Sequence, residues 1–154
     1  FEARQEEKDI MKRKPRNPKE KIFNKQTIFL SVLQGILILI IIALMFKFAL
    51  YLNKTEFEAR TLAFATLIIS NIALILSNLS WKESVFSVTK QENKSLIYIV
   101  LGAISFLLLT IYVPYLSGLF LFHPLNLNEW GMILIAGIFA LSSFEIFKKV
   151  IKIN

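Results

Sequence analysis

Two asparagines stand in a long apolar stretch of the sequence, at positions 71 and 78. Seven residues make almost two turns of an α-helix, so a helix would carry Asn71 and Asn78 on one face. Ser70 and Ser77 lie beside them and extend a polar stripe. An asparagine can offer its carbonyl oxygen to a hard cation, or it can hydrogen-bond to a neighbouring helix. Because one amide does not bind a cation alone, these residues by themselves favour the hydrogen bond.

Gln34 and Glu145 are two more polar side chains in apolar surroundings, where polar groups need partners. Glu145 follows Trp130 by fifteen residues and precedes Lys148 by three. Fifteen residues span about 22 Å of helix. We therefore interpret Glu145 as a carboxylate near a helix end, paired with Lys148 or Lys149, rather than as a deeply placed proton carrier. Gln34, Asn78 and Glu145 are thus expected to be structural polar residues.

The sequence lacks the usual motifs for covalent chemistry. It has no cysteine and one histidine, and it contains no glycine-rich phosphate loop and no Ser-His-Asp set. We expect no catalytic residue and no cofactor site in this chain.

Four apolar stretches must position the polar residues, at 27–52, 61–79, 96–117 and 130–147. Of the 154 residues 55% are hydrophobic, and the mean hydropathy is +0.59. A membrane-spanning helix needs about 20 apolar residues. The stretches are continuous rather than alternating, which argues against barrel strands. The sequence predicts an all-α membrane protein with four transmembrane helices in residues 27–154, with Pro114 ending the third helix.

Charge is concentrated at the two ends of the chain, and the net charge is +7. If both termini are cytoplasmic, fifteen Lys and Arg side chains lie inside and three outside. The opposite orientation reverses this ratio, so we expect both termini in the cytoplasm of a multi-pass protein of the cell membrane. Small residues within the stretches predict close helix packing; they are Ser31, Gly35, Gly102, Ser105, Gly131 and Gly137.

The segment "EKDIMKRKPRNPKEKIF", residues 7–23, is strongly basic, with seven Lys or Arg in seventeen positions. It could lie on anionic lipid, bind nucleic acid or dock on another protein domain. Interleaved acidic residues and prolines argue against the first two, and we expect no nucleic-acid partner.

The same segment carries the sharpest resemblance to a known family. It matches the pattern D-I-M-x-R-x-P-R followed by E-x-x-F, which is typical of P-type cation-transporting ATPases after their sixth transmembrane helix. The matching residues are Asp9, Ile10, Met11, Arg13, Pro15, Arg16, Glu20 and Phe23. Lys14 and Lys21 stand where members often have proline.

Later segments resemble the same family in the same order. "QGILILI" resembles the seventh helix, and "ARTLAFATLIISNIALILSNLS" resembles the eighth. "IYVPYLSGLF", "PLNLNEW" and "FEIFKK" resemble the end of the ninth helix, the loop into the tenth and the closing turn. The chain is identified as the C-terminal membrane region, helices seven to ten, of the group that includes calcium and sodium pumps. It begins with Phe1, and we expect it to be a piece of a longer protein.

The resemblance implies a role within an ATP-driven pump. The parent protein would use ATP and magnesium to phosphorylate an aspartate in a cytoplasmic domain, and its other helices would supply most cation ligands. Asn71 falls where some members have a ligand on the eighth helix, so it is a candidate ligand of the transported cation. Calcium is the first candidate and other cations remain open. Two-site calcium pumps have glutamate there, so an asparagine favours one calcium per cycle or another cation.

The resemblance also assigns residues 1–26 to a cytoplasmic coupling loop under the phosphorylation domain, with Asp9, Arg13 and Arg16 as its contact residues. Two alternatives remain. One is a free-standing four-span accessory or scaffold protein without ATPase activity. The other is a small channel or carrier, which is disfavoured because no stretch carries a charge at mid-membrane.

Overall fold

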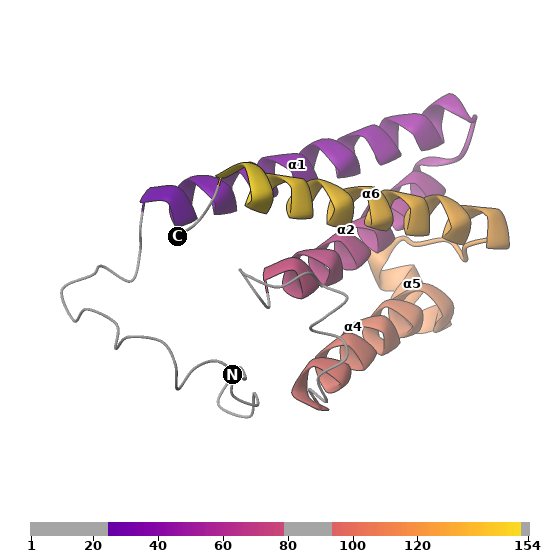
Figure 1. Cartoon of the computed structure of the whole chain (residues 1–154). Coiled ribbons are helices and arrows are strands. Elements are labelled where there is room, and N and C mark those ends of the chain that lie inside the picture. Colours follow the sequence, from indigo (N-terminus) through magenta and orange to yellow (C-terminus); the bar gives the residue numbers. More distant parts are fainter. Residues whose placement is uncertain (1–24, 79–93, 152–154) are drawn as a thin grey trace.

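The computed structural model describes residues 25–78 and 94–151, while residues 1–24, 79–93 and 152–154 lie outside the described part. Its elements are α1 (Lys25–Tyr51), α2 (Glu56–Asn78), α4 (Lys94–Tyr112), α5 (Pro114–Phe120) and α6 (Leu127–Ile151) (Figure 1). The four long helices are each long and apolar enough to cross a membrane. No strand occurs in these residues. The predicted all-α, four-span, multi-pass integral membrane protein is confirmed.

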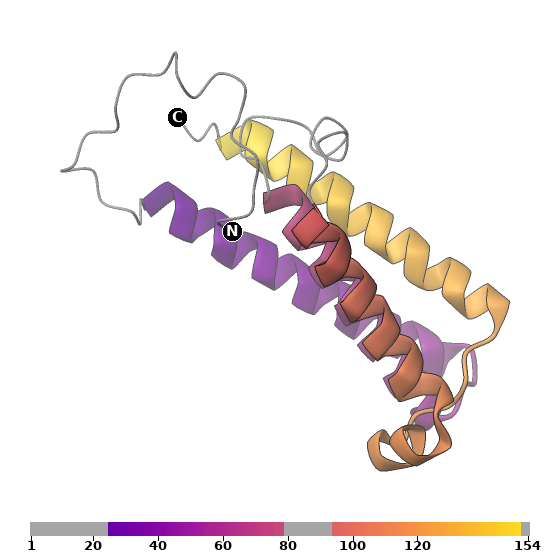
Figure 2. The same ribbon diagram turned by 90° about the horizontal axis from the view of Figure 1, so that it is seen from below.

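Successive long helices run in opposite directions (Figures 1 and 2). One end of the bundle holds the first turns of α1 and α4 and the last turns of α2 and α6. We call it the terminal end. At the other end, which we call the hairpin end, α1 turns into α2 and the chain from α4 enters α6. Helices satisfy their own backbone hydrogen bonds, as hydrocarbon requires. Because four helices make an even number of crossings, the first and last described residues lie on the same side of any membrane that all four helices cross.

α2 begins at a capping box, five residues before the apolar stretch 61–79. The Thr55 N–H donates to the Glu58 carboxylate at 2.8 Å, and the Glu58 N–H donates to the Thr55 hydroxyl at 3.3 Å. These two bonds satisfy backbone donors that a helix start leaves free. The preceding turn contains Asn53 in the left-handed region, at φ 57°, which asparagine tolerates better than most residues.

Pro114 divides the third apolar stretch into two helices. α4 ends at Tyr112, and Pro114 opens the seven-residue helix α5. Proline has no N–H for the helix ladder but suits the first turn of a new helix. The expected span 96–117 is therefore shared between α4 and α5.

α2 is the central helix of the bundle, because it contacts α1, α4 and α6. α2 and α6 approach closely at one glycine, where a Cβ added to Gly137 would lie 2.5 Å from the Ile69 Cγ2. Gly35, Gly102 and Gly131 have open space at this position. Within the described part of the chain, the expected close packing at glycine is therefore found at Gly137 alone.

Candidate functional site

Asn71 lies half-buried on α2 and makes no side-chain hydrogen bond to any described residue. Ile75, one turn further along, is 40% exposed. Asn78, two turns along, faces α1. Asn71 therefore lies at the border between the α1-facing side of α2 and a side that the described helices leave uncovered. Its amide oxygen is available to a ligand.

Asn78 has a different environment, because its amide is paired with Gln34 of α1. Gln34 Nε2 donates to Asn78 Oδ1 at 3.2 Å, and Asn78 Nδ2 donates to Gln34 Oε1 at 3.3 Å. Gln34 is 1% exposed. Each amide satisfies a donor and an acceptor of the other, which joins α1 to α2 near the terminal end. The pair accounts for two polar residues that the sequence analysis regarded as structural.

Glu145 and Lys148 of α6 hold the last turn of α2. The Glu145 carboxylate lies 2.7 Å from the Lys148 ammonium and accepts a hydrogen bond from the Ser77 hydroxyl at 3.1 Å. Lys148 also donates to the Ser77 carbonyl oxygen at 2.5 Å. A cation at the carbonyl end of a helix complements its dipole. Glu145 therefore pairs with Lys148, the nearer in sequence of the two lysines considered, and fastens α2 to α6.

Thr66 and Ser70 add two buried hydroxyls to α2. Both are fully buried, and neither hydroxyl has a hydrogen-bond partner in the described part of the chain. They are four residues apart, and Ser77, seven residues beyond Ser70, bonds to α6. Thr66 and Ser70 therefore lie on the face of α2 that packs against α6, whereas Asn71 lies on a different face. Thr66 was not predicted from the sequence, although its four-residue spacing from Ser70 places both on one helix face.

Lys54 is the centre of an ionic cluster at the hairpin end. Its ammonium contacts the Glu129 carboxylate at the start of α6 and lies 3.6 Å from Glu58. Glu129 also accepts a hydrogen bond from the Asn126 N–H at 2.6 Å. The hydrogen bond to Glu129 raises the pKa of Lys54 above its ordinary value. Lys54 was not singled out from the sequence, because its partner lies 75 residues away.

Aromatic side chains and the loop before α6 complete the hairpin end. The Trp130 Nε1 donates to the Tyr112 hydroxyl at 3.1 Å, and that hydroxyl donates to the Leu125 carbonyl oxygen at 3.1 Å. The His123 N–H donates to the Thr61 hydroxyl at 2.9 Å. These bonds tie α2, α4 and α6 together, so the hairpin end is held by several polar links.

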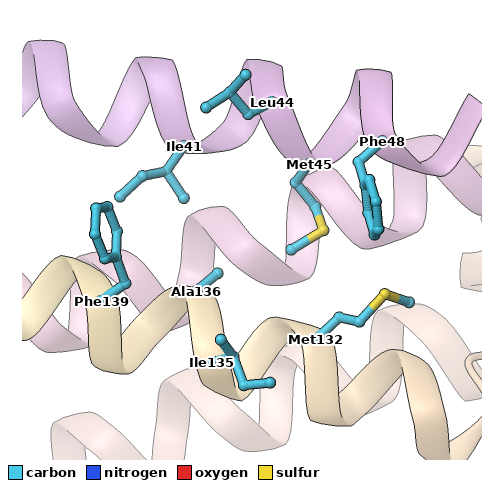
Figure 3. Close-up of a pocket in the computed structure, with 8 residues that line it drawn as sticks. All are labelled: Ile41, Leu44, Met45, Phe48, Met132, Ile135, Ala136 and Phe139. Carbon is cyan, nitrogen blue, oxygen red and sulfur yellow. The ribbon is translucent and has the colours of Figure 1, made fainter. Parts of the chain in front are cut away.

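A groove of about 560 Å³ runs between α1 and α6 (Figure 3). Its lining is apolar: Ile41, Leu44, Met45, Phe48, Met132, Ile135, Ala136 and Phe139. None of these side chains offers an oxygen, so the groove does not suit a hard cation. Among the described residues, no group of three or more His, Cys, Asp or Glu side chains could hold a metal ion. Asn71 can therefore be only one member of a larger ligand set.

Asp9, Arg13 and Arg16, the expected contact residues of the coupling loop, lie outside the described residues.

Comparison with known proteins places this bundle in a family. Residues 1–150 match the family described as "Cation transporting ATPase, C-terminus". The "Calcium-transporting ATPase" of Bacillus subtilis is 35% identical over 91% of this chain and 16% of its own length. "Calcium-transporting ATPase 1" of Bacillus cereus is 31% identical over 93% of this chain and 18% of its own length.

Animal relatives are also similar. "Calcium-transporting ATPase type 2C member 1" of Mus musculus is 30% identical over 80% of this chain and 13% of its own length. The chain thus spans less than a fifth of the curated relatives it matches. Because the family match covers nearly all of the sequence in one order, the chain belongs to the C-terminal family of the cation-transporting ATPases.

Proposed function

We propose that this chain is the C-terminal membrane domain of an ATP-driven calcium pump. The observation that carries the proposal is the family match over residues 1–150, together with relatives named calcium-transporting ATPases. In this role, residues 27–154 shape the transport site, and residues 1–26 form the cytoplasmic loop that couples it to the phosphorylation domain. ATP and magnesium act on the parts of the parent protein that lie outside this chain.

Asn71 is the proposed contribution of α2 to the cation site. Its support is the contrast with Asn78, whose amide is satisfied by Gln34 while Asn71 has no such partner among the described residues. An amide oxygen is a suitable ligand for calcium, which takes 6–8 oxygen ligands. Since Asn71 brings one oxygen and no charge, most of the remaining ligands must come from other helices of the parent protein.

The proposal is tested on the full polypeptide that contains this sequence. Membranes that carry it are incubated with ATP labelled in the γ-phosphate, with and without calcium. We expect an acid-stable label that requires calcium and is released by hydroxylamine, as an aspartyl phosphate would be. A label that requires a different cation would support the pump function but identify that cation, instead of calcium, as the substrate. A native polypeptide near 17.7 kDa with no label would instead favour the free-standing four-span protein.

A further inference from the structure

We propose that Gln34 is a positioning residue for Asn71: its amide pair with Asn78 sets the rotation of α2 and thereby the direction of the Asn71 side chain. The inference rests on the proposed function, because it concerns how the cation site is held. It assigns to a buried residue of α1 an effect on a site that this residue does not touch.

The fully buried residues of α2 are mostly small. Leu62 is the one large side chain among the eight buried residues of this helix; the others are Ala59, Thr61, Ala65, Thr66, Ser70, Ala73 and Ser77. Small side chains allow helices to approach closely. Larger, half-buried side chains of the same helix pack against the two apolar clusters; they are Phe64, Leu67, Ile68, Ile69 and Leu74. Packed helices can still shift or turn by small amounts, and a directional contact limits such a shift.

The Gln34–Asn78 pair supplies such a contact. Its two hydrogen bonds, at 3.2 and 3.3 Å, fix the Asn78 amide in both donor and acceptor directions. Because Gln34 is 1% exposed, water does not readily replace Asn78 as its partner. Turning α2 away from α1 would therefore leave the buried amide of Gln34 and the half-buried amide of Asn78 unpaired.

The helix carries this constraint to Asn71. Seven residues separate Asn71 from Asn78, which is about 10 Å along the axis and about 20° short of two full turns. The two amides thus project from nearly the same side of one rigid helix. The Ser77–Glu145–Lys148 contacts fasten the last turn of α2 to α6 on another side of the helix. The amide pair adds the contact that fixes what faces α1.

The test uses calcium-dependent phosphorylation of the full pump. Gln34→Leu removes the amide pair at similar volume, and we expect about a fivefold weaker apparent calcium affinity with the maximal phosphoenzyme level retained. Gln34→Leu combined with Asn71→Ala should be no weaker than Asn71→Ala alone, because a misdirected ligand and a missing ligand lose the same interaction. Ser31→Ala is the matched control on α1, since this exposed hydroxyl bonds only to the Thr27 carbonyl of its own helix.

Rescue separates positioning from simple support of the fold. Exchanging the two amides, Gln34→Asn with Asn78→Gln, keeps a pair of the same total length and should restore the affinity. Additive effects of Gln34→Leu and Asn71→Ala would overturn the proposal. Normal calcium affinity in Gln34→Leu would also overturn the positioning role. If Asn71→Ala weakened calcium binding in that case, the proposed ligand role of Asn71 would still stand. Normal affinity in Asn71→Ala would overturn the ligand role and the positioning with it.

A second measurement does not depend on activity. The chain contains no cysteine, so Asn71→Cys gives this segment a single thiol whose alkylation rate reports its direction. We expect Gln34→Leu to change that rate by about fivefold. The rate of Ile75→Cys should change much less, because this position is already 40% exposed. An unchanged rate at both positions would overturn the proposal even if the pump were inactive.

Discussion

Asn71 differs from Asn78 in having no amide partner among the described residues, and this difference makes it the sharper target for mutation. If its oxygen binds calcium, Asn71→Leu should weaken the apparent calcium affinity of phosphorylation by about five- to tenfold, since one ligand of several is lost. Asn71→Asp keeps an oxygen and adds a charge, so its affinity should be equal or stronger. Calcium titration of phosphoenzyme measures both variants.

Ser143→Ala is a control for Asn71, because the Ser143 hydroxyl donates to the Phe139 carbonyl of its own helix and should not affect the affinity. Equal affinities for the wild type, Asn71→Leu and Asn71→Asp would remove Asn71 from the cation site. Its polarity would then be explained by contacts with helices of the parent protein.

Gly137 provides a prediction about stability rather than transport. An alanine Cβ would lie 2.5 Å from the Ile69 Cγ2, and a β-branched side chain has few rotamers with which to move away. We expect Gly137→Ala to destabilise the protein by about 1–3 kcal/mol, as overpacking usually does. Thermal unfolding in detergent measures the effect.

Gly35→Ala is the matched control for Gly137→Ala, because open space surrounds the Gly35 position. Alanine is a better helix former than glycine, so this variant should be neutral or slightly stabilised. In Gly137→Ala combined with Ile69→Ala the clash disappears, and the two changes should be less than additive. Additive effects would mean that the contact with Ile69 is not the cause.

At the scale of elements, Lys54 joins the α1–α2 turn to the start of α6. The Glu129 side chain is 3% exposed, so Lys54→Met leaves a buried carboxylate with only the Asn126 N–H as a described partner. We expect a loss of about 2 kcal/mol of stability. Arg60→Met is the control, because its 3.7 Å pair with Glu56 is exposed and should contribute little.

The pH dependence of this effect follows from the raised pKa of Lys54. A raised pKa means that the folded state favours the charged form, so this contribution is present below the ordinary value of 10.5 and is lost as the pH rises through the folded value. The stability difference between wild type and Lys54→Met should therefore persist at neutral and mildly alkaline pH. A difference that vanished near neutrality would contradict this assignment to the lysine.

The helices were predictable from the sequence, but the contacts between them were not. Long apolar runs and Pro114 have local physical consequences, so the four spans and the end of α4 could be predicted. The helix α2 begins five residues before the apolar stretch 61–79, and apolar patterning does not predict these residues because the capping box consists of polar side chains. The partner of Asn78 depends on how α1 and α2 rotate against each other, and a pattern along one helix does not contain that information.

At the scale of the whole molecule, the described chain makes four passes and returns to the end where it began (Figure 1). The charge count predicts that this terminal end is cytoplasmic, since it then places fifteen of eighteen Lys and Arg side chains inside. That orientation would put residues 1–24 and the end of α6 on the side where ATP is available. The basic segment is then in a position to meet a cytoplasmic domain.

Arg13 and Arg16 distinguish a specific protein contact from general attraction to lipid. If they bind acidic groups or carbonyls of the phosphorylation domain, Arg13→Lys with Arg16→Lys should lower turnover about tenfold at unchanged apparent calcium affinity, because lysine does not reproduce the two-pronged hydrogen bonding of arginine. Attraction to anionic lipid, about 1 kcal/mol for each basic residue, depends on charge alone and would be unaffected by this exchange.

Lys19→Ala with Lys21→Ala is the matched control, since it removes two charges from the same segment and spares both arginines. Calcium-dependent ATP hydrolysis by the full pump gives turnover and affinity together. Full turnover in the double lysine variant, with a loss in the double alanine control, would assign the segment to the membrane surface instead of the phosphorylation domain.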